Sequence, residues 1–106
     1  MPRFLFIGTY SPQGAKAIMA AGGSSRRSVI EKMIADLGGR LETFDFALGS
    51  DDVYTIADLP DQRTATAVSL AVNASGVVSL RTVALVTPEE MDAAGQVHAN
   101  YQPPGA

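Results

Sequence analysis

The side chains best suited to proton transfer are one histidine and two tyrosines. His98 is the only histidine, and an imidazole that titrates near neutral pH is the usual proton shuttle in proteins. It lies in a polar segment near the end of the chain, where most histidines have no catalytic role. Tyr10 and Tyr54 each lie in an apolar run. Each phenol is expected either to donate a hydrogen bond into a cleft between sheet and helices or to pack as an amphipathic aromatic.

A group of basic residues marks the candidate anion site. Arg26, Arg27 and Lys32 follow Gly22-Gly23 at the predicted start of a helix, where free backbone N–H groups bind carboxylates and phosphates. The two glycines lack the spacing and the preceding strand of a dinucleotide-binding loop. The sequence therefore predicts an anion site that does not bind a nucleotide, and a solvated helix face is the alternative.

Metal and nucleophile chemistry has little support in the sequence. There are no cysteines and no second histidine, so we expect no metal site and no cofactor. Ser24, Ser25 and Ser28 are better explained as helix caps than as members of a Ser/His/acid arrangement.

Charge is distributed unevenly along the chain. The net charge is -3, but residues 1–40 carry six basic and two acidic groups, and residues 41–106 carry two basic and nine acidic groups. An acidic protein is a poor candidate for binding nucleic acid, which needs a basic surface. The asymmetry can steer an anionic ligand to the first helices, or let opposite ends of neighbouring subunits attract each other.

The length of 106 residues and the hydrophobic content of 46% are typical of one folded domain. That domain is expected to span residues 1–106, with residues 95–106 as a polar C-terminal arm. No apolar run is long enough to cross a membrane, and the N-terminus lacks the pattern of a signal peptide. A cytoplasmic protein is the resulting expectation.

Turn and cap residues divide the first half of the chain. A β-rich run predicts a strand over residues 3–10, and Ser11 with Pro12 predicts the start of a helix that ends before Gly22. Ser24 or Ser25 is then expected to cap a second helix, whose apolar positions fall on one face that should be core. These positions are Val29, Ile30, Met33, Ile34 and Leu37.

The second half follows the same logic. Strands are predicted over residues 40–48 and 52–59, joined as an antiparallel hairpin, and Asp61 is expected to cap a helix that ends at residues 73–76. A strand over residues 77–86 and a short helix with a capping box at Thr87 complete the chain. The order βαββαβ predicts an α+β, ferredoxin-like fold: a four-stranded antiparallel sheet with both helices on one face, plus a short C-terminal helix.

Both faces of the predicted sheet are apolar. The first strand alternates Phe4 and Phe6 with Leu5 and Ile7, so the face without helices needs a cover. Sheet-on-sheet packing of two copies is the simplest cover, and we therefore predict at least a homodimer. The alternative is that the C-terminal helix or tail folds over this face.

Charged residues within strands need partners when they are covered. Arg81 lies in the middle of the last predicted strand, and Asp45, within the subunit or across a dimer, is its expected partner. With Tyr54 and the basic group at residues 26–32, Arg81 completes the predicted ligand-binding residues.

Several turn motifs follow one another along the chain: Gly38-Gly39, residues 49–52, Leu59-Pro60-Asp61 and Asn73-Ala74-Ser75-Gly76. In their order and spacing they resemble the GYD-domain family of small bacterial proteins. The family's signature is a Gly followed closely by Tyr-Asp. Gly49 and Asp52 fit its ends, whereas Ser50 or Asp51 stands where the Tyr would be, so any role that needs this phenol is not carried over.

The resemblance implies the fold of the dimeric α/β-barrel group, which includes small monooxygenases, isomerases and haem-handling enzymes, although GYD proteins have no established activity. We expect a small organic ligand in a cleft between sheet and helices, with Tyr10 and His98 as catalytic residues if cofactor-free oxygenation or isomerisation occurs. A non-catalytic regulatory or assembly module is the alternative. Gly49 and Asp52 are expected to serve the turn, and shared-proton chemistry between Asp51 and Asp52 is disfavoured because adjacent strand residues point to opposite faces.

Overall fold

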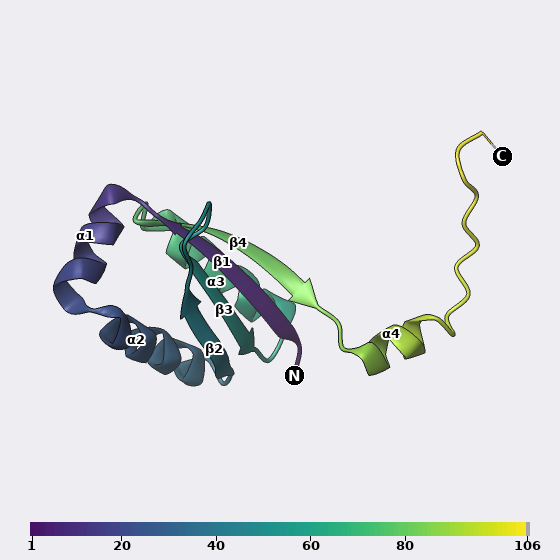
Figure 1. The fold of residues 1–106 in the computed structure, drawn as a ribbon. Helices are drawn as coiled ribbons and strands as arrows, with labels where there is room; N and C mark the ends of the chain where they lie inside the picture. Colours follow the sequence, from purple (N-terminus) through teal and green to yellow (C-terminus); the bar gives the residue numbers. More distant parts are fainter. Residues whose placement is uncertain (106) are drawn as a thin grey trace.

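The computed structural model describes residues 1–105 as one antiparallel sheet with helices on one face and an arm that leaves the body of the molecule (Figure 1). In chain order the elements are β1 (Arg3–Tyr10), α1 (Pro12–Ala21), α2 (Gly23–Asp36), β2 (Arg40–Phe46), β3 (Val53–Asp58), α3 (Gln62–Ala74), β4 (Val78–Leu85) and α4 (Pro88–Ala94).

The four strands pair in the order β2-β3-β1-β4, and all three pairings are antiparallel. This is an α+β architecture consistent with the ferredoxin-like fold, which confirms the predicted fold class. The β2–β3 register shifts between Leu41 and Thr43, where a bulge bends the edge strand. No helix within residues 1–105 has the length and apolar character that a bilayer crossing requires.

The core lies between the sheet and the helices. Phe4 and Phe6 of β1 point to this side, where they pack with Ile34 of α2 and Val68 of α3. Leu59, directly after β3, is fully buried in the same cluster. Burial of each such side chain contributes about 1.5–3 kcal/mol, so the alternation within β1 fixes which sheet face the helices cover.

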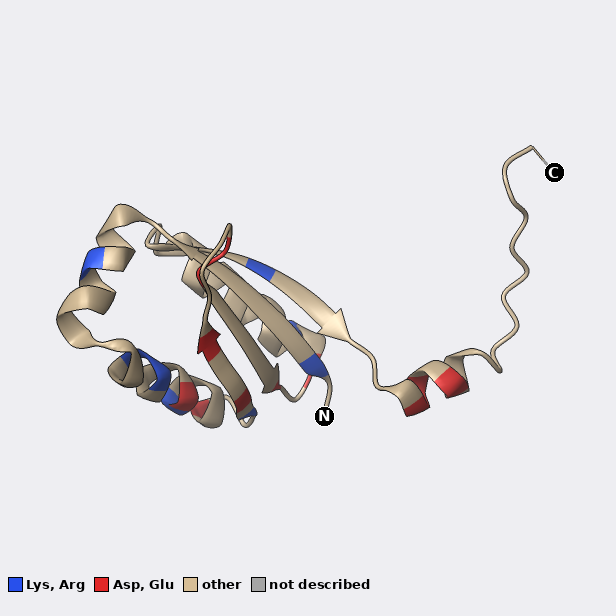
Figure 2. Cartoon of the chain, viewed as in Figure 1, with Lys and Arg blue, Asp and Glu red and all other residues tan. Residues whose placement is uncertain are grey.

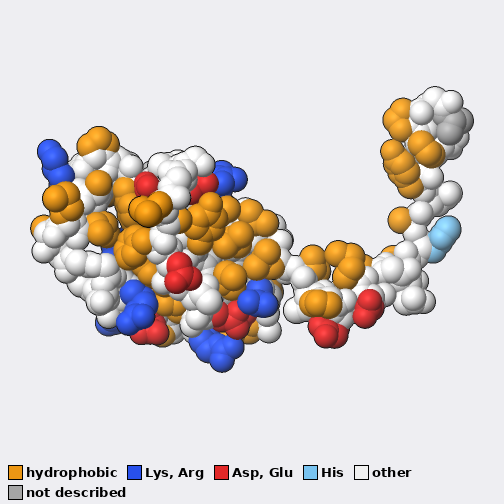
Figure 3. Space-filling model, viewed as in Figure 1, with side chains coloured by type: hydrophobic (Ala, Val, Ile, Leu, Met, Phe, Trp, Pro, Cys, Tyr) orange, Lys and Arg blue, Asp and Glu red, His pale blue; other side chains and the backbone are white. Residues whose placement is uncertain are grey.

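The opposite face of the sheet, called the open face below, is apolar at its centre. The register places Leu5 of β1 between Ile56 of β3 and Val83 of β4, all pointing away from the helices. Hydrophobic side chains gather over the strands in this view (Figure 3). Neither α4 nor the following segment covers this face (Figure 1). The predicted homodimer would cover it and stays a prediction.

The α2 helix differs from the expectation in two respects. It begins at Gly23, with Gly22 as N-cap at φ 90° and no side-chain cap, so the predicted capping by Ser24 or Ser25 is wrong. The sharp bend at Gly22 already separates α2 from α1 and places both serines inside the first turn. The buried stripe is also narrower than predicted, because Ile34 is 1% exposed whereas Val29 is 53% exposed.

The strand predicted over residues 40–48 is shorter in the structure. β2 ends at Phe46, and Leu48 is fully exposed in the turn that follows. The β2–β3 turn is closed by Ala47 N, which donates to Asp52 O, and is attached to β1 by Asp52 N, which donates to Gly8 O. These two backbone bonds direct the turn towards the end of β1.

Candidate functional site

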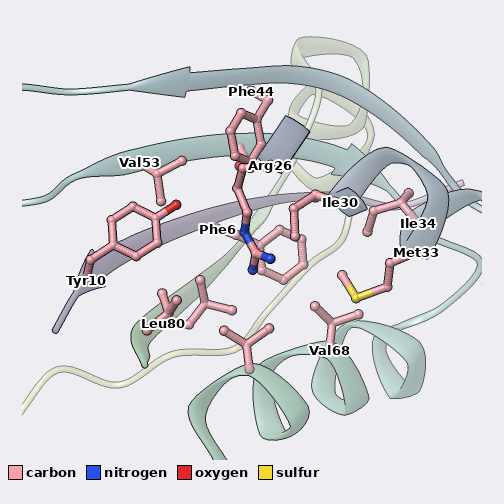
Figure 4. Close-up of a pocket in the computed structure, with 13 residues that line it drawn as sticks. Phe6, Tyr10, Arg26, Ile30, Met33, Ile34, Phe44, Val53, Val68 and Leu80 are labelled. Atoms are coloured by element: carbon pink, nitrogen blue, oxygen red, sulfur yellow. The ribbon is translucent and has the colours of Figure 1, made fainter. Parts of the chain in front are cut away.

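A cleft between the sheet and the helices forms the candidate site (Figure 4). Its inner part is a cavity of about 50 Å³ lined almost entirely by apolar side chains, among them Phe6, Met33 and Leu80. An outer part of about 500 Å³ lies between α1, α2 and α3. Tyr10 and Arg26 line both parts, so the two polar side chains mark the place where the inner and outer spaces meet.

Tyr10 reaches the cleft because the end of β1 is held in place. Its backbone N–H donates to Asp52 Oδ2 at 2.8 Å, and its ring packs on Phe46 with centroids 6.4 Å apart. Burial raises the pKa of the phenol above its usual 10.0, while the nearby Arg26 guanidinium opposes the rise and Asp52 adds to it. The hydroxyl is therefore protonated at neutral pH and available as a hydrogen-bond donor.

Arg26 enters the same cleft from the first turns of α2. Figure 4 shows its guanidinium among apolar side chains, on the side of the cavity that Tyr10 faces. The residue is half-buried, yet no carboxylate of residues 1–105 forms an ion pair with it. A cation removed from water without a counter-charge is unfavourable. The arrangement can therefore hold an anion that the chain itself does not supply.

The other two members of the predicted basic group lie outside the cleft. Arg27 is exposed and lines hollows between α2 and the edge strand β2. Lys32 forms an i,i+4 ion pair with Asp36 at 2.8 Å, and the hydrogen bond to Asp36 raises the pKa of its ammonium group. Because successive helix residues are rotated by about 100°, the structure brings only Arg26 of this group to Tyr10.

A second polar cluster lies on the open face, around Asp51. Its carboxylate accepts from Arg81 Nη2 at 3.1 Å, from Thr9 Oγ1 at 3.1 Å and from Tyr54 Oη at 3.4 Å. Within the chain the predicted Arg81–Asp45 pair is wrong, because β3 and β1 separate the two edge strands that carry these residues. Of the two alternatives for Tyr54, the register excludes a position in the cleft, because it places the side chain on the open face, and leaves the packed amphipathic aromatic.

The two residues that match the family signature lie in the turn itself. Gly49 has φ 153°, a conformation that favours glycine. The carboxylate of Asp52 binds the backbone of Tyr10, whereas that of Asp51 binds side chains on the open face. The adjacent carboxylates thus have separate partners, which agrees with a structural role for Asp52 and gives no shared-proton site.

His98 is exposed on the arm that follows α4, well away from the cleft (Figure 3). The structure therefore does not bring His98 to Tyr10 within one chain. Residues 1–105 also hold no group of three or more His, Cys, Asp or Glu side chains arranged for a metal ion.

Sequence reasoning missed one polar residue of the cleft. Thr55 is buried and lines the inner cavity. The alternation in β3 could have found it, because Thr55 shares its face with Val53 and Ala57 and so has to point towards the helices. It adds a hydroxyl to a wall that is otherwise apolar.

Comparison with known proteins bears on the fold as a whole. The family model of the GYD domain matches residues 4–94, from the start of β1 to the last residue of α4. No curated protein and no solved structure matches the chain. The match covers most of the 106 residues and leaves residues 1–3 and the segment after α4 outside. The chain belongs to the GYD domain family.

Proposed function

We propose that the protein binds a small organic carboxylate in the cleft, with the carboxylate at Arg26 and Tyr10 and the apolar body along the helices. The observation that supports this is the half-buried guanidinium without an ion-pair partner in residues 1–105. A guanidinium and a protonated phenol supply one positive charge and several donors, which suits a monoanion.

The dimensions of the cleft limit the ligand. About 10–15 Å³ of cavity space admits one water molecule, so the inner cavity of about 50 Å³ takes a group of a few heavy atoms. The outer part, about 500 Å³, lies within the range of small-molecule sites. Its wall is formed by residues such as Gly14, Ala17 and Ile18. A single aromatic ring or a short aliphatic chain fits this space and its apolar wall.

Catalysis would be a further step at the same site. Tyr10 could act there as a general acid, because its phenol stays protonated at neutral pH. Cofactor-free oxygenation or isomerisation remains the proposal for such a step. His98 would have to come from another copy of the chain, since its own arm stands away from the cleft.

A homo-oligomeric assembly role is the second candidate. It is supported by the apolar open face, where Leu5, Ile56 and Val83 have no covering element within residues 1–105. Two such faces packed together would remove this surface from water. The cleft lies on the other side of the sheet, so assembly and ligand binding do not compete for the same residues.

Binding can be tested with benzoate as the probe and benzamide as its neutral analogue, by isothermal titration calorimetry. Loss of a charge-assisted hydrogen bond costs about 1.5–3 kcal/mol, so Arg26→Met should weaken benzoate binding by about 10- to 100-fold. Arg27→Met is the matched control, because this neighbour is exposed, and it should bind like the unmodified protein. Equal affinity for benzamide, or unchanged benzoate binding by Arg26→Met, would refute the proposal.

A further inference from the structure

The C-terminal arm, taken from here on to include α4 and so to span residues 86–105, has exposed apolar side chains. α4 and the segment after it extend away from the sheet and the other helices (Figure 1), and the chain measures 56 Å in its longest dimension against 34 and 23 Å in the others. Val86, Met91, Val97 and Tyr101 are each more than half exposed. Apolar groups repeated along one segment indicate a surface that another element covers.

The sequence of α4 specifies a helix that cannot be stable alone. Thr87 and Glu90 form a complete capping box, with Pro at the start of the helix. A helix of seven residues is nevertheless far too short to persist in water without tertiary contacts. Strong local signals in a segment that lies away from the sheet and the other helices therefore point to a partner outside the chain.

α4 is amphipathic. Positions three apart share one side of a helix, which places Pro88, Met91 and Ala94 in one apolar stripe. The three acidic residues Glu89, Glu90 and Asp92 lie around the rest of the helix. The matching surface should therefore offer an apolar floor on elements whose net charge is positive.

Such a surface lies between α2 and α3. A groove of about 520 Å³ separates these helices, lined by Val29, Met33 and Leu37 of α2 and by Ala67 and Ala71 of α3. These positions repeat every four residues, so each helix contributes one apolar stripe. Lys32 and Asp36 also line the groove, where they form an ion pair with each other.

The charges of the arm and of the helices are complementary. The arm carries three acidic side chains and no Lys or Arg, a net charge of -3. Helices α1, α2 and α3 together carry five basic and two acidic side chains, a net charge of +3. Figure 2 shows basic residues on α1, basic and acidic residues side by side on α2, and the acidic residues of the arm on α4. Opposite charges of this size guide association and fix orientation.

We propose that the arm of one copy binds in the groove between α2 and α3 of a second copy, with the Met91 stripe on the apolar floor and the acidic side towards the helices, which carry a net positive charge. Docking into its own groove is disfavoured by the short connection, because Val86 alone separates the end of β4 from the N-cap Thr87. The helix therefore leaves the sheet outwards instead of turning back over α3 (Figure 1).

Disulfide cross-linking tests this arrangement directly, because the chain has no cysteines of its own. An isotope-labelled Ala94→Cys protein is mixed with unlabelled Ala67→Cys protein and oxidised in air, and the products are weighed by mass spectrometry. Ala94 lies in the arm stripe and the exposed Ala67 lines the groove. We expect a disulfide-linked dimer of mixed mass, in excess of either homodimer.

Three controls make the result decisive. Adding Met91→Glu to the Ala94→Cys chain should abolish the mixed dimer, and raising the salt concentration should reduce it. Preferential cross-linking to Val83→Cys, on the open face, would overturn the proposal in favour of an arm that covers the sheet. An internal disulfide in the double variant Ala94→Cys/Ala67→Cys at high dilution, or no cross-link at all, would also overturn it. No ligand is needed, so the outcome is independent of binding at Arg26.

Discussion

The turn between β2 and β3 contains two adjacent carboxylates, Asp51 and Asp52. Substituting each in turn compares two contributions to stability: the number of hydrogen bonds lost and the burial of the partner that is left unpaired. Asp51 accepts from three side chains, whereas the side chain of Asp52 accepts only from the backbone N–H of Tyr10. By the number of bonds, Asp51→Ala should be the more damaging change. We expect the reverse, with Asp52→Ala the more destabilising of the two.

The reason is what remains after each substitution. Arg81, the charged partner of Asp51, has a side chain that is 65% exposed, and exposed ion pairs contribute about 0–1 kcal/mol because water replaces the lost contact. The N–H of Tyr10 is part-buried and fixed by β1, so it cannot turn towards water. Leaving such a donor unpaired costs about 1–3 kcal/mol. The two costs should therefore differ measurably.

Urea unfolding of three variants measures the difference. Asp52→Ala should lower the free energy of unfolding by about 1–2 kcal/mol, and a loss of 1 kcal/mol lowers Tm by about 4–8 °C in a domain near this size. Asp52→Asn keeps an acceptor oxygen and should lose less. An Asp51→Ala cost equal to or above that of Asp52→Ala in dilute protein would refute the reasoning. A cost for Asp51→Ala that grows with protein concentration would instead show that the open face is covered in an oligomer.

Three further predictions follow from local environments. Burial raises the pKa of the Tyr10 phenol above 10.0, so the phenol keeps its proton to higher pH in the folded state than in the unfolded state. The free energy of unfolding should therefore fall as pH rises from about 10 through the folded-state pKa. Urea unfolding of Tyr10→Phe over the same pH range should lack this loss. Hydrogen bonds from Thr64 lower the pKa of the Asp61 carboxyl below 3.8. The ionised cap therefore stabilises the fold at neutral pH, and this contribution is lost as pH falls through the lowered pKa. Asp61→Asn should accordingly show a smaller loss of unfolding free energy at acid pH. A Cβ at Gly39 would overlap the carbonyl oxygen at the end of β3 and meet Leu59 Cδ2 at 2.9 Å. Gly39→Ala should therefore lower the free energy of unfolding by about 1–3 kcal/mol or more. Gly95→Ala is the control and should lower it by less than about 0.5 kcal/mol, because a Cβ at Gly95 has only ordinary contacts.

Local chemistry explains why the elements could be predicted from the sequence. Ser11, Asp61 and Thr87 each cap a helix through a side-chain bond to a backbone N–H three residues on. Such bonds depend on neighbours in the sequence, so the residue types reveal them. The failure at Ser24 and Ser25 has the same origin, because the positive φ of Gly22 ends α1 and starts α2 without any side-chain cap.

The site depends on information that is not local. Adjacent basic residues suggested one anion site, but helix geometry directs Arg26 into the cleft and leaves Arg27 in solvent. That Arg26 lacks an ion-pair partner follows only once the acidic side chains of residues 1–105 have been placed. The partner of Arg81 likewise depends on strand order, since Asp51 reaches it through a turn that folds back over β1. No pattern in the sequence contains either fact.

The same turn links the two faces of the sheet. Asp52 holds the backbone of Tyr10, whose phenol faces the cleft, while Asp51 holds Thr9, Tyr54 and Arg81 on the open face. Substitution of Asp52 should therefore disturb ligand binding without touching the open face, because only the cleft side loses a bond. Substitution of Asp51 should disturb packing on the open face and leave Tyr10 in place. The pair thus separates the ligand-binding proposal from the assembly proposal: if both variants change both properties, the two faces are coupled through the end of β1.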